Sequence, residues 1–197
     1  MVCTSCQRQA LGGLTHPVCQ TRYGIDGVFP SLVYKGVVKK LVYVFKYPPY
    51  LHDLKPQLVD LFYEGIIQKE YLMPLLTAQS VFIPIPLHAA KFRKRGYNQS
   101  FLLAESLAKR FDMQVADCLK RNKPTKTQVG FSKDDRKQNI ANAFSLRGDV
   151  SNLVKSYKHA LLVDDVVTSG ATLREAAKVL KRAGFAHVWG VTLAHGE

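Results

Sequence analysis

Long apolar runs are absent from this sequence of 197 residues. Its apolar segments are short and interrupted by Lys, Asp or Pro, and none approaches the roughly 20 residues that a helix needs to span a bilayer. The first residues, Met-Val-Cys-Thr-Ser-Cys, lack the charged and then apolar pattern of a secretory signal. We therefore expect a cytoplasmic protein that does not insert into a membrane.

Acidic residues are scarce beside basic ones, with 15 Asp and Glu against 28 Lys and Arg and a formal net charge of +13. This balance favours a polyanionic partner, either a phosphorylated small molecule or nucleic acid, although a basic protein without a specific partner has the same composition. Hydrophobic residues make up 47% of the chain, which is enough for a buried core. The length fits one α/β domain with a small appendage.

Cysteine is also scarce, and three of the four cysteines lie among the first nineteen residues. In a cytoplasmic chain such clustering favours a metal site over a disulfide framework. Residues 1–25 show no helical or strand period and contain few apolar side chains, so we expect them to need a metal to fold. We predict a small zinc-finger-like module over residues 1–25, with structural Zn²⁺ held by Cys3, Cys6, His16 and Cys19. The alternative is a degenerate site that binds no metal.

The periodicity of apolar residues predicts alternating strands and helices after the cysteine-containing segment. Residues 159–163 are apolar throughout, as in a strand buried on both faces. With the following helix and strand they form a βαβ unit, which predicts a parallel sheet. A polar, basic stretch over residues 121–139 has the features of a functional loop. The predicted strands cover residues 28–34, 80–86, 115–119, 159–163 and 187–193, and the predicted helices cover residues 35–47, 54–69, 99–111 and 171–183.

The segment that follows Val163 has the chemistry of a phosphate site. A buried strand brings two adjacent carboxylates, Asp164 and Asp165, to the carboxyl edge of a sheet. A loop of Thr, Ser and Gly then enters a helix, whose N-terminal N–H groups and dipole bind anions. The acids suit ribose hydroxyls, directly or through Mg²⁺. The alternative, an Asp pair that caps the helix beside ordinary turn residues, explains one Asp and one Thr but not the whole string.

This string of four apolar residues, Asp-Asp, two variable residues and Thr-Ser-Gly-x-Thr resembles the signature of the type I phosphoribosyltransferases. The resemblance implies that the chain binds 5-phosphoribosyl 1-pyrophosphate (PRPP), or a related ribose 5-phosphate ligand, together with Mg²⁺. In that family the acidic pair meets the ribose hydroxyls and the next loop cradles the 5′-phosphate. The matching loop residues are Val166, Val167, Thr168, Ser169, Gly170, Ala171 and Thr172.

Other strings resemble the ComF/GntX family, whose members are associated with natural competence, the uptake of DNA. The resemblance implies a type I phosphoribosyltransferase-like α/β fold over residues 26–197, with a hood at about 28–75 and a core over 80–197. ComF-like proteins often carry a second Cys-x-x-Cys pair, whereas Arg22 stands here in place of the fourth Cys. The strings that carry the resemblance are Ile83-Pro84-Ile85-Pro86-Leu87, Arg93-x-Arg95-Gly96-Tyr97-Asn98-Gln99, Thr127-Gln128 and Arg136-x-x-Asn139.

The resemblance also assigns residues to three parts of the site. The candidate catalytic residues are Asp164, Asp165 and Arg95. The turn that matches the pyrophosphate loop contains Leu87, His88 and Ala89, although for His88 itself an ordinary turn role is the favoured interpretation. The segment that matches the flexible lid carries Arg121, Lys123, Lys126 and Arg136. The alternative interpretation of this segment is an ordinary basic loop.

Two functions from different classes remain open, and a third hypothesis is a regulator that has kept the fold but lost catalysis. One is a ComF-like protein that binds PRPP with Mg²⁺ and, if it is an enzyme, displaces pyrophosphate at the anomeric carbon of the ribose. The other is a non-catalytic accessory protein of transformation that holds single-stranded DNA through its basic clusters. A homodimer is a further expectation.

Overall fold

A five-stranded parallel sheet lies at the centre of the protein, with strand order β1-β7-β6-β2-β3. The computed structural model describes residues 1–47, 54–124 and 140–196. A small antiparallel pair of strands stands beside the main sheet. The strands of the main sheet are β1 (Gly27–Val33), β2 (Ser80–Pro84), β3 (Gln114–Val115), β6 (His159–Val167) and β7 (His187–His195), and the small pair is β4 (Leu119–Arg121) and β5 (Phe144–Leu146).

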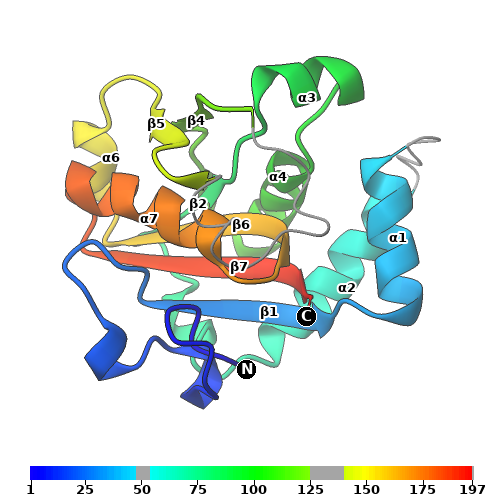
Figure 1. Cartoon of the computed structure of the whole chain (residues 1–197), viewed down its shortest axis with the longest axis horizontal. Coiled ribbons are helices and arrows are strands. Elements are labelled where there is room, and N and C mark those ends of the chain that lie inside the picture. The colour runs from blue at the N-terminus through cyan, green and yellow to red at the C-terminus, as the bar shows by residue number, and fades with distance from the viewer. Residues whose placement is uncertain (48–53, 125–139, 197) are drawn as a thin grey trace.

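Helices cover both faces of the sheet (Figure 1). One face carries α7 (Ala171–Ala183), and the other carries α2 (Lys55–Ile67) and α4 (Gln99–Phe111). The remaining helices are α1 (Gly36–Lys46), α3 (Ala89–Arg95) and α6 (Ser151–Ser156), with short 3-10 turns at Leu11–Gly13, Pro17–Cys19 and Met73–Leu75. The predicted α/β class, a parallel sheet flanked by helices, is confirmed. Across the described ranges, no helix has the length and apolarity that crossing a membrane requires.

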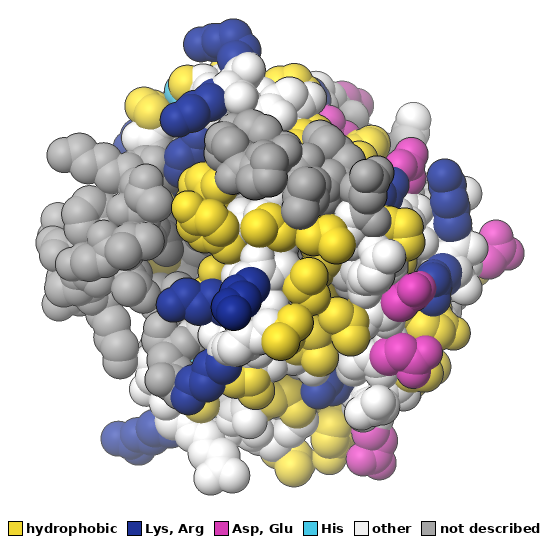
Figure 2. Space-filling model, turned by 90° about the vertical axis from the view of Figure 1, so that its right-hand side faces the viewer, with side chains coloured by type: hydrophobic (Ala, Val, Ile, Leu, Met, Phe, Trp, Pro, Cys, Tyr) yellow, Lys and Arg dark blue, Asp and Glu magenta, His cyan; other side chains and the backbone are white. Residues whose placement is uncertain are grey.

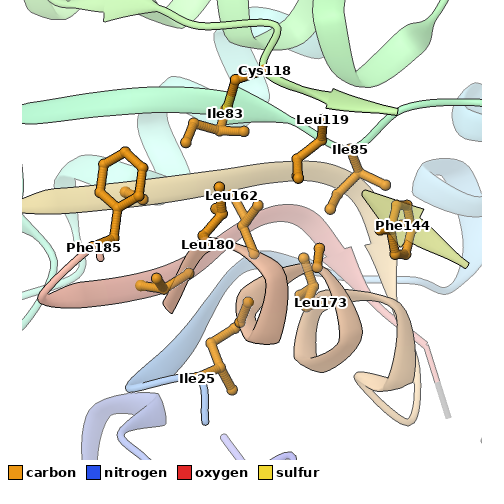
Figure 3. Close-up of a cluster of buried hydrophobic side chains, with 14 of the residues drawn as sticks. Ile25, Ile83, Ile85, Cys118, Leu119, Phe144, Leu162, Leu173, Leu180 and Phe185 are labelled. Carbon is orange, nitrogen blue, oxygen red and sulfur yellow. The ribbon is translucent and has the colours of Figure 1, made fainter. Parts of the chain in front are cut away.

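Alternate side chains of the central strand β6 point into two separate hydrophobic clusters. Leu162 packs in one cluster with Leu173 and Leu180 of α7, which Figure 3 shows in close-up. Its neighbours Leu161 and Val163 belong to the second cluster, which is formed with α2 and α4. All three strand residues are fully buried. The apolar run predicted as a strand buried on both faces is therefore confirmed.

Strand β6 continues four residues beyond its predicted end and includes the acidic pair. Its partner β7 runs alongside as far as His195, and their pairing continues through Asp164 and Val167. The sequence placed the end of the strand where the apolar run ended, but backbone pairing does not depend on apolar side chains. Asp164 and Asp165 are therefore held by a regular strand.

Two predicted boundaries are wrong in the segment after α4. The single strand predicted over residues 115–119 is instead the end of β3 and the start of β4. The backbone turns between them, where Ala116 N–H donates to the carbonyl of Phe82. Arg121 ends β4, so it is a strand residue and not part of the predicted loop over 121–139. Elements of three to seven residues, such as β5 and α3, are too short to show a period.

The part of the chain predicted as a hood contributes a strand to the main sheet. Strand β1 pairs in parallel with β7, and the helices predicted over 35–47 and 54–69 are found as α1 and α2. Figure 2 shows the side of the molecule on which α1 lies, where apolar and basic side chains are mixed. Val37 and Tyr43 of α1 are exposed by 70% and 56%. The hood assignment and the homodimer stay predictions.

Candidate ligand site at the carboxyl edge of the sheet

The acidic pair at the end of β6 is held by neighbours from two other elements. Asp165 is 7% exposed, and the Nζ atom of Lys46, at the end of α1, lies 2.8 Å from its Oδ1. The Oδ1 atom of Asp164 accepts hydrogen bonds from Ser100 Oγ at 3.0 Å and from the Asp165 N–H at 2.9 Å. Burial, and then the charge of Asp165, raises the pKa of Asp164 to about 7. Asp165 is therefore paired with a cation, whereas Asp164 takes up a proton more readily than an ordinary carboxyl group.

Lys46 retains its charge inside the site. Burial lowers the pKa of Lys46, but the charge and hydrogen bond of Asp165 more than offset this, so the pKa lies above its ordinary value. Lys46 was not predicted from the sequence, because a basic residue at the end of an amphipathic helix belongs to no motif. Ser100 was not predicted either, although it directly follows the family string that ends at Gln99.

A cavity of about 180 Å³ opens over the acidic pair, and basic side chains outnumber acidic ones on its walls. Burial and the charges of Arg121, Arg95 and Lys46 lower the pKa of Lys91. Because these cations repel one another, a bound anion would stabilise all of them. The charged residues that line the cavity are Lys46, Lys91, Arg95, Arg121, Asp164 and Asp165.

The structure brings together the seven residues predicted to cradle a 5′-phosphate around one small hollow. Val166 and Val167 reach it from β6, and Ala171 and Thr172 from the first turn of α7. Gly170 has φ +69°, which a side chain disfavours. A Cβ atom on Gly170 would also lie 2.7 Å from the Cγ2 atom of Thr4. The glycine is therefore needed for its conformation and for close packing against the N-terminal segment.

The three residues of the predicted pyrophosphate turn have different roles in the structure. Leu87 lines the cavity over the acidic pair. The Nδ1 atom of His88 accepts the N–H of Ala90 at 3.2 Å and caps α3, which agrees with the turn role favoured for His88. Ala89 is the first residue of α3 and lines a neighbouring, larger cavity.

The residues predicted to lie on a flexible lid are found at different places. Arg121 is at the end of β4, where its side chain lines the cavity and its backbone pairs with His88. Lys123 is exposed and donates to the carbonyl of Ala141 at 3.0 Å. Lys126 and Arg136 lie outside the described residues. Arg95 lines the cavity and stacks over the ring of Tyr47 at 5.7 Å.

A second cavity of about 650 Å³ adjoins the first, and Pro86, Leu87 and Arg121 line both. Its wall is largely aromatic and apolar, and the charged residues at its edge are mostly basic. Among the described residues on its wall Asp117 is the acidic one, and its Oδ2 atom lies 3.4 Å from the Nη1 atom of Arg147. The other lining residues include Phe92, Tyr97, Phe101, Leu102, Arg93 and Lys120.

Four potential metal ligands meet in the N-terminal segment. One donor atom from each of Cys3, Cys6, His16 and Cys19 lies within 4.8 Å of the others. Burial would raise the pKa of Cys3, but hydrogen bonds from the backbone of Cys6 and His16 bring it down to about 6. Burial and the neighbouring thiols raise the pKa of Cys19 to about 11. This donor set fits a tetrahedral Zn²⁺ site, and Arg22 is not part of it.

Comparison with known proteins identifies the family. The model of the phosphoribosyl transferase domain matches residues 98–196, from the start of α4 to the end of β7. The chain belongs to this family. The predicted resemblance to ComF-like proteins is confirmed, because the chain is similar to competence proteins.

Three relatives illustrate the extent of the likeness. Competence protein F of Haemophilus influenzae is 42% identical over 122 residues, which are 60% of this chain and 52% of that protein. The DNA utilization protein YhgH of Escherichia coli K12 is 37% identical over 107 residues, or 54% and 45% of the two chains. Competence protein ComFC of Bacillus subtilis is 33% identical over 108 residues, or 53% and 39%. The chain matches about half the length of these curated relatives.

Proposed function

We propose that this ComF-like protein binds PRPP with Mg²⁺ at the carboxyl edge of its sheet. The observation that carries the proposal is that Asp164 lines two adjoining hollows of different chemistry. It lines both the small hollow of the Thr-Ser-Gly loop and the cavity whose walls carry Asp165 and the basic side chains. PRPP has a matching arrangement, with ribose hydroxyls between a 5′-phosphate and a 1-pyrophosphate.

Each part of the site has a role in this proposal. The loop over residues 168–172 holds the 5′-phosphate at the N-terminus of α7. Asp164 and Asp165 accept the ribose hydroxyls. Lys91, Arg95 and Arg121 hold the pyrophosphate, which cations can bind in charge-assisted hydrogen bonds.

Two buried polar side chains support a polar ligand here. The Nε2 atom of Gln99, a residue on the cavity wall, has no hydrogen-bond partner among the described residues. The same holds for the Oγ atom of Ser169 beside the small hollow, within the described part of the chain. Unpaired buried polar atoms are costly, and a ligand with phosphate and hydroxyl groups can pair with them.

The residues present also fit the proposed Mg²⁺. Asp164 and Asp165 are the acidic side chains on the described wall of the cavity, and Mg²⁺ prefers a few carboxylate and phosphate oxygens with several waters. When bound, Mg²⁺ would neutralise charge on the pyrophosphate. In a transfer reaction the bond between the anomeric carbon and a pyrophosphate oxygen breaks. Lys91, Arg95 and Arg121 would then stabilise the negative charge of the departing pyrophosphate.

Ligand-induced stabilisation tests the proposed binding. The melting temperature should rise with PRPP and Mg²⁺, and Asp164→Asn with Asp165→Asn should abolish the rise because both hydroxyl acceptors lose their charge. Asp60→Asn is a matched control, since this carboxylate is exposed on α2 and pairs with Arg110. An unchanged melting temperature of the parent protein across a PRPP titration would overturn the proposal.

Single-stranded nucleic acid is a second candidate ligand, and the larger cavity favours it. Aromatic side chains that stack on bases, with cations for phosphates, are the features of sequence-tolerant single-strand sites. Phe92, Phe101 and Arg93 line the cavity, and the names of the relatives refer to competence and DNA utilization. Phe101→Ala should weaken binding of a short single strand, and raising the salt concentration should weaken it steeply. Absence of binding at low salt would exclude this candidate.

We further propose that the N-terminal cluster holds structural Zn²⁺ and that the protein works in the cytoplasm. The four donor atoms support the first point. The second is supported by the four cysteines, none of which forms a disulfide bond.

A further inference from the structure

The N-terminal cysteine module lies against the back of the 5′-phosphate loop, and one arginine joins them. The Nη1 atom of Arg174, in the first turn of α7, donates hydrogen bonds to the carbonyl of Ser169 at 2.6 Å and to the carbonyl of Thr4. Ser169 belongs to the loop, and Thr4 lies between the first two cysteines of the cluster. The Arg174 side chain therefore connects residues that are 165 positions apart in the sequence.

A second side chain bridges the same two carbonyls. The Nε2 atom of Gln7 donates to Thr4 O at 2.9 Å and to Ser169 O at 3.3 Å. Gln7 has φ +63°, a conformation that is uncommon outside glycine. Its N–H donates to the carbonyl of Cys3 at 2.7 Å, so its position depends on the turn that carries the cysteines.

The two surfaces also pack without space between them. A Cβ atom at Gly170 would lie 2.7 Å from both the Cβ and the Cγ2 atoms of Thr4. The Oγ1 atom of Thr4 is buried and has no hydrogen-bond partner within the described ranges. The Thr4 side chain therefore packs directly against the loop at Gly170.

Peptide geometry links this contact to phosphate binding. In a planar trans peptide the C=O and N–H groups point in opposite directions. Arg174 and Gln7 draw the carbonyl of Ser169 towards the module. The N–H of Gly170 in the same peptide then points away from the module, and Gly170 lines the phosphate hollow.

We propose that Arg174 and Gln7 are positioning residues, through which metal binding at Cys3, Cys6, His16 and Cys19 pre-organises the 5′-phosphate loop. The inference rests on the proposed function, because it assumes that the loop binds a phosphorylated ligand. No residue of the turn over residues 3–6 belongs to either hydrophobic cluster, and a metal would hold its thiols together. Loss of the metal releases Thr4 and Gln7, and the loop then has to be ordered by the ligand itself at a cost in affinity.

The test measures affinity for ribose 5-phosphate by calorimetry in the full chain, loaded with Zn²⁺ or stripped by a zinc-selective chelator. Stripping should weaken binding by about tenfold, within the usual range of coupling between two sites. Arg174→Met should keep its Zn²⁺ and bind about tenfold more weakly even when loaded, and stripping should then have little further effect because the connection is already broken. Lys178→Met is the matched control, since this exposed residue lies one turn further along α7.

Three results would overturn the inference. One is equal affinity of the loaded and stripped parent, with both forms folded by circular dichroism. Another is parent-like affinity of zinc-loaded Arg174→Met. If that variant does not fold, Gln7→Ala replaces it, and parent-like affinity of zinc-loaded Gln7→Ala has the same meaning.

Hydrogen exchange separates this inference from the proposed function. Amide exchange over residues 168–172 needs no ligand, and it should become faster after stripping and in Arg174→Met. Unchanged exchange would overturn the link between module and loop. If exchange changes as expected but the loaded parent binds neither ribose 5-phosphate nor PRPP with Mg²⁺, the proposed function is wrong and the link stands.

Discussion

The ammonium group of Lys46 lies 2.8 Å from the carboxylate of Asp165, which pairs the last turn of α1 with the acidic motif at the end of β6. The two residues are far apart in the sequence, and the side chains of both are largely buried, at 21% and 10% exposed. The proposed ribose site therefore depends on a helix that lies outside residues 98–196, the part of the chain that matches the phosphoribosyl transferase domain.

Removal of the Lys46 charge should destabilise the protein. Lys46→Met leaves the buried Asp165 without its cation, and we expect the free energy of unfolding in urea to fall by about 1–3 kcal/mol, less than for a fully buried pair because Lys46 is partly exposed. Lys40→Met on the exposed side of the same helix should change it by less than about 0.5 kcal/mol. The combination of Lys46→Met with Asp165→Asn should recover part of the loss, and equal stability of Lys46→Met and the parent would contradict the ion pair.

Replacement of Lys91 should weaken the binding of a ligand that carries a pyrophosphate more than the binding of one that carries only a 5′-phosphate. It lines the cavity with Arg95 and Arg121, so Lys91→Met should weaken PRPP binding by about tenfold, the loss expected for one charge-assisted contact. Affinity for ribose 5-phosphate, which lacks the pyrophosphate, should change little. Lys94→Met on the same helix is the control, because Lys94 is exposed and does not line the cavity. Equal weakening of both ligands would place Lys91 elsewhere in the site.

The zinc content of the protein should depend on the cysteines of the N-terminal cluster and not on Cys118. We expect one Zn²⁺ per chain in the purified protein, measured by mass spectrometry for elements, and a lower content in Cys19→Ser because a ligand is lost. Cys118→Ala should keep its Zn²⁺, since Cys118 is buried in the hydrophobic cluster that contains Ile83. Removal of the metal should also lower the melting temperature. A metal-free parent protein would show that the cluster is degenerate.

His159 should make stability depend on pH at the far end of the sheet from the ligand site. Burial, and then the charges of His187 and Lys158, lowers the pKa of His159, although Asp26 partly opposes this. The folded state therefore binds fewer protons than the unfolded state, so the stability contributed by neutral His159 is present above its ordinary pKa of 6.5 and is lost as pH falls below it. We expect His159→Gln to reduce the fall in the free energy of unfolding between pH 7 and 5.

The stacked partner of His159 provides the control for that experiment. The ring centroids of His159 and His187 are 5.1 Å apart. His187→Gln removes one cause of the lowered pKa, so it should flatten the pH dependence by less than His159→Gln. An identical pH profile for the parent and His159→Gln would show that this histidine does not titrate in the range.

Short-range features of the fold were predictable from the sequence. Helix α7 occupies the predicted residues, because its apolar face has a helical period and Gly184 ends it with φ +111°. The buried run over residues 159–163 predicted the central strand. Three predicted boundaries were wrong, those at β3, at β4 and at the end of β6. Backbone pairing with distant strands sets these boundaries, and such pairing produces no periodic pattern of side chains in the sequence.

The sequence by itself determined that two adjacent carboxylates and a Thr-Ser-Gly loop follow a buried strand, because these residues are contiguous, and this local order predicts the proposed ligand. It also grouped the four potential metal ligands, which lie within nineteen residues. Only the tertiary structure showed that Lys46 pairs with Asp165, that Lys91, Arg95 and Arg121 meet at one cavity, and that Arg174 joins the cysteine module to the phosphate loop. These contacts join residues far apart in the chain, and their partners are chosen by the packing of helices on the sheet rather than by any spacing in the sequence.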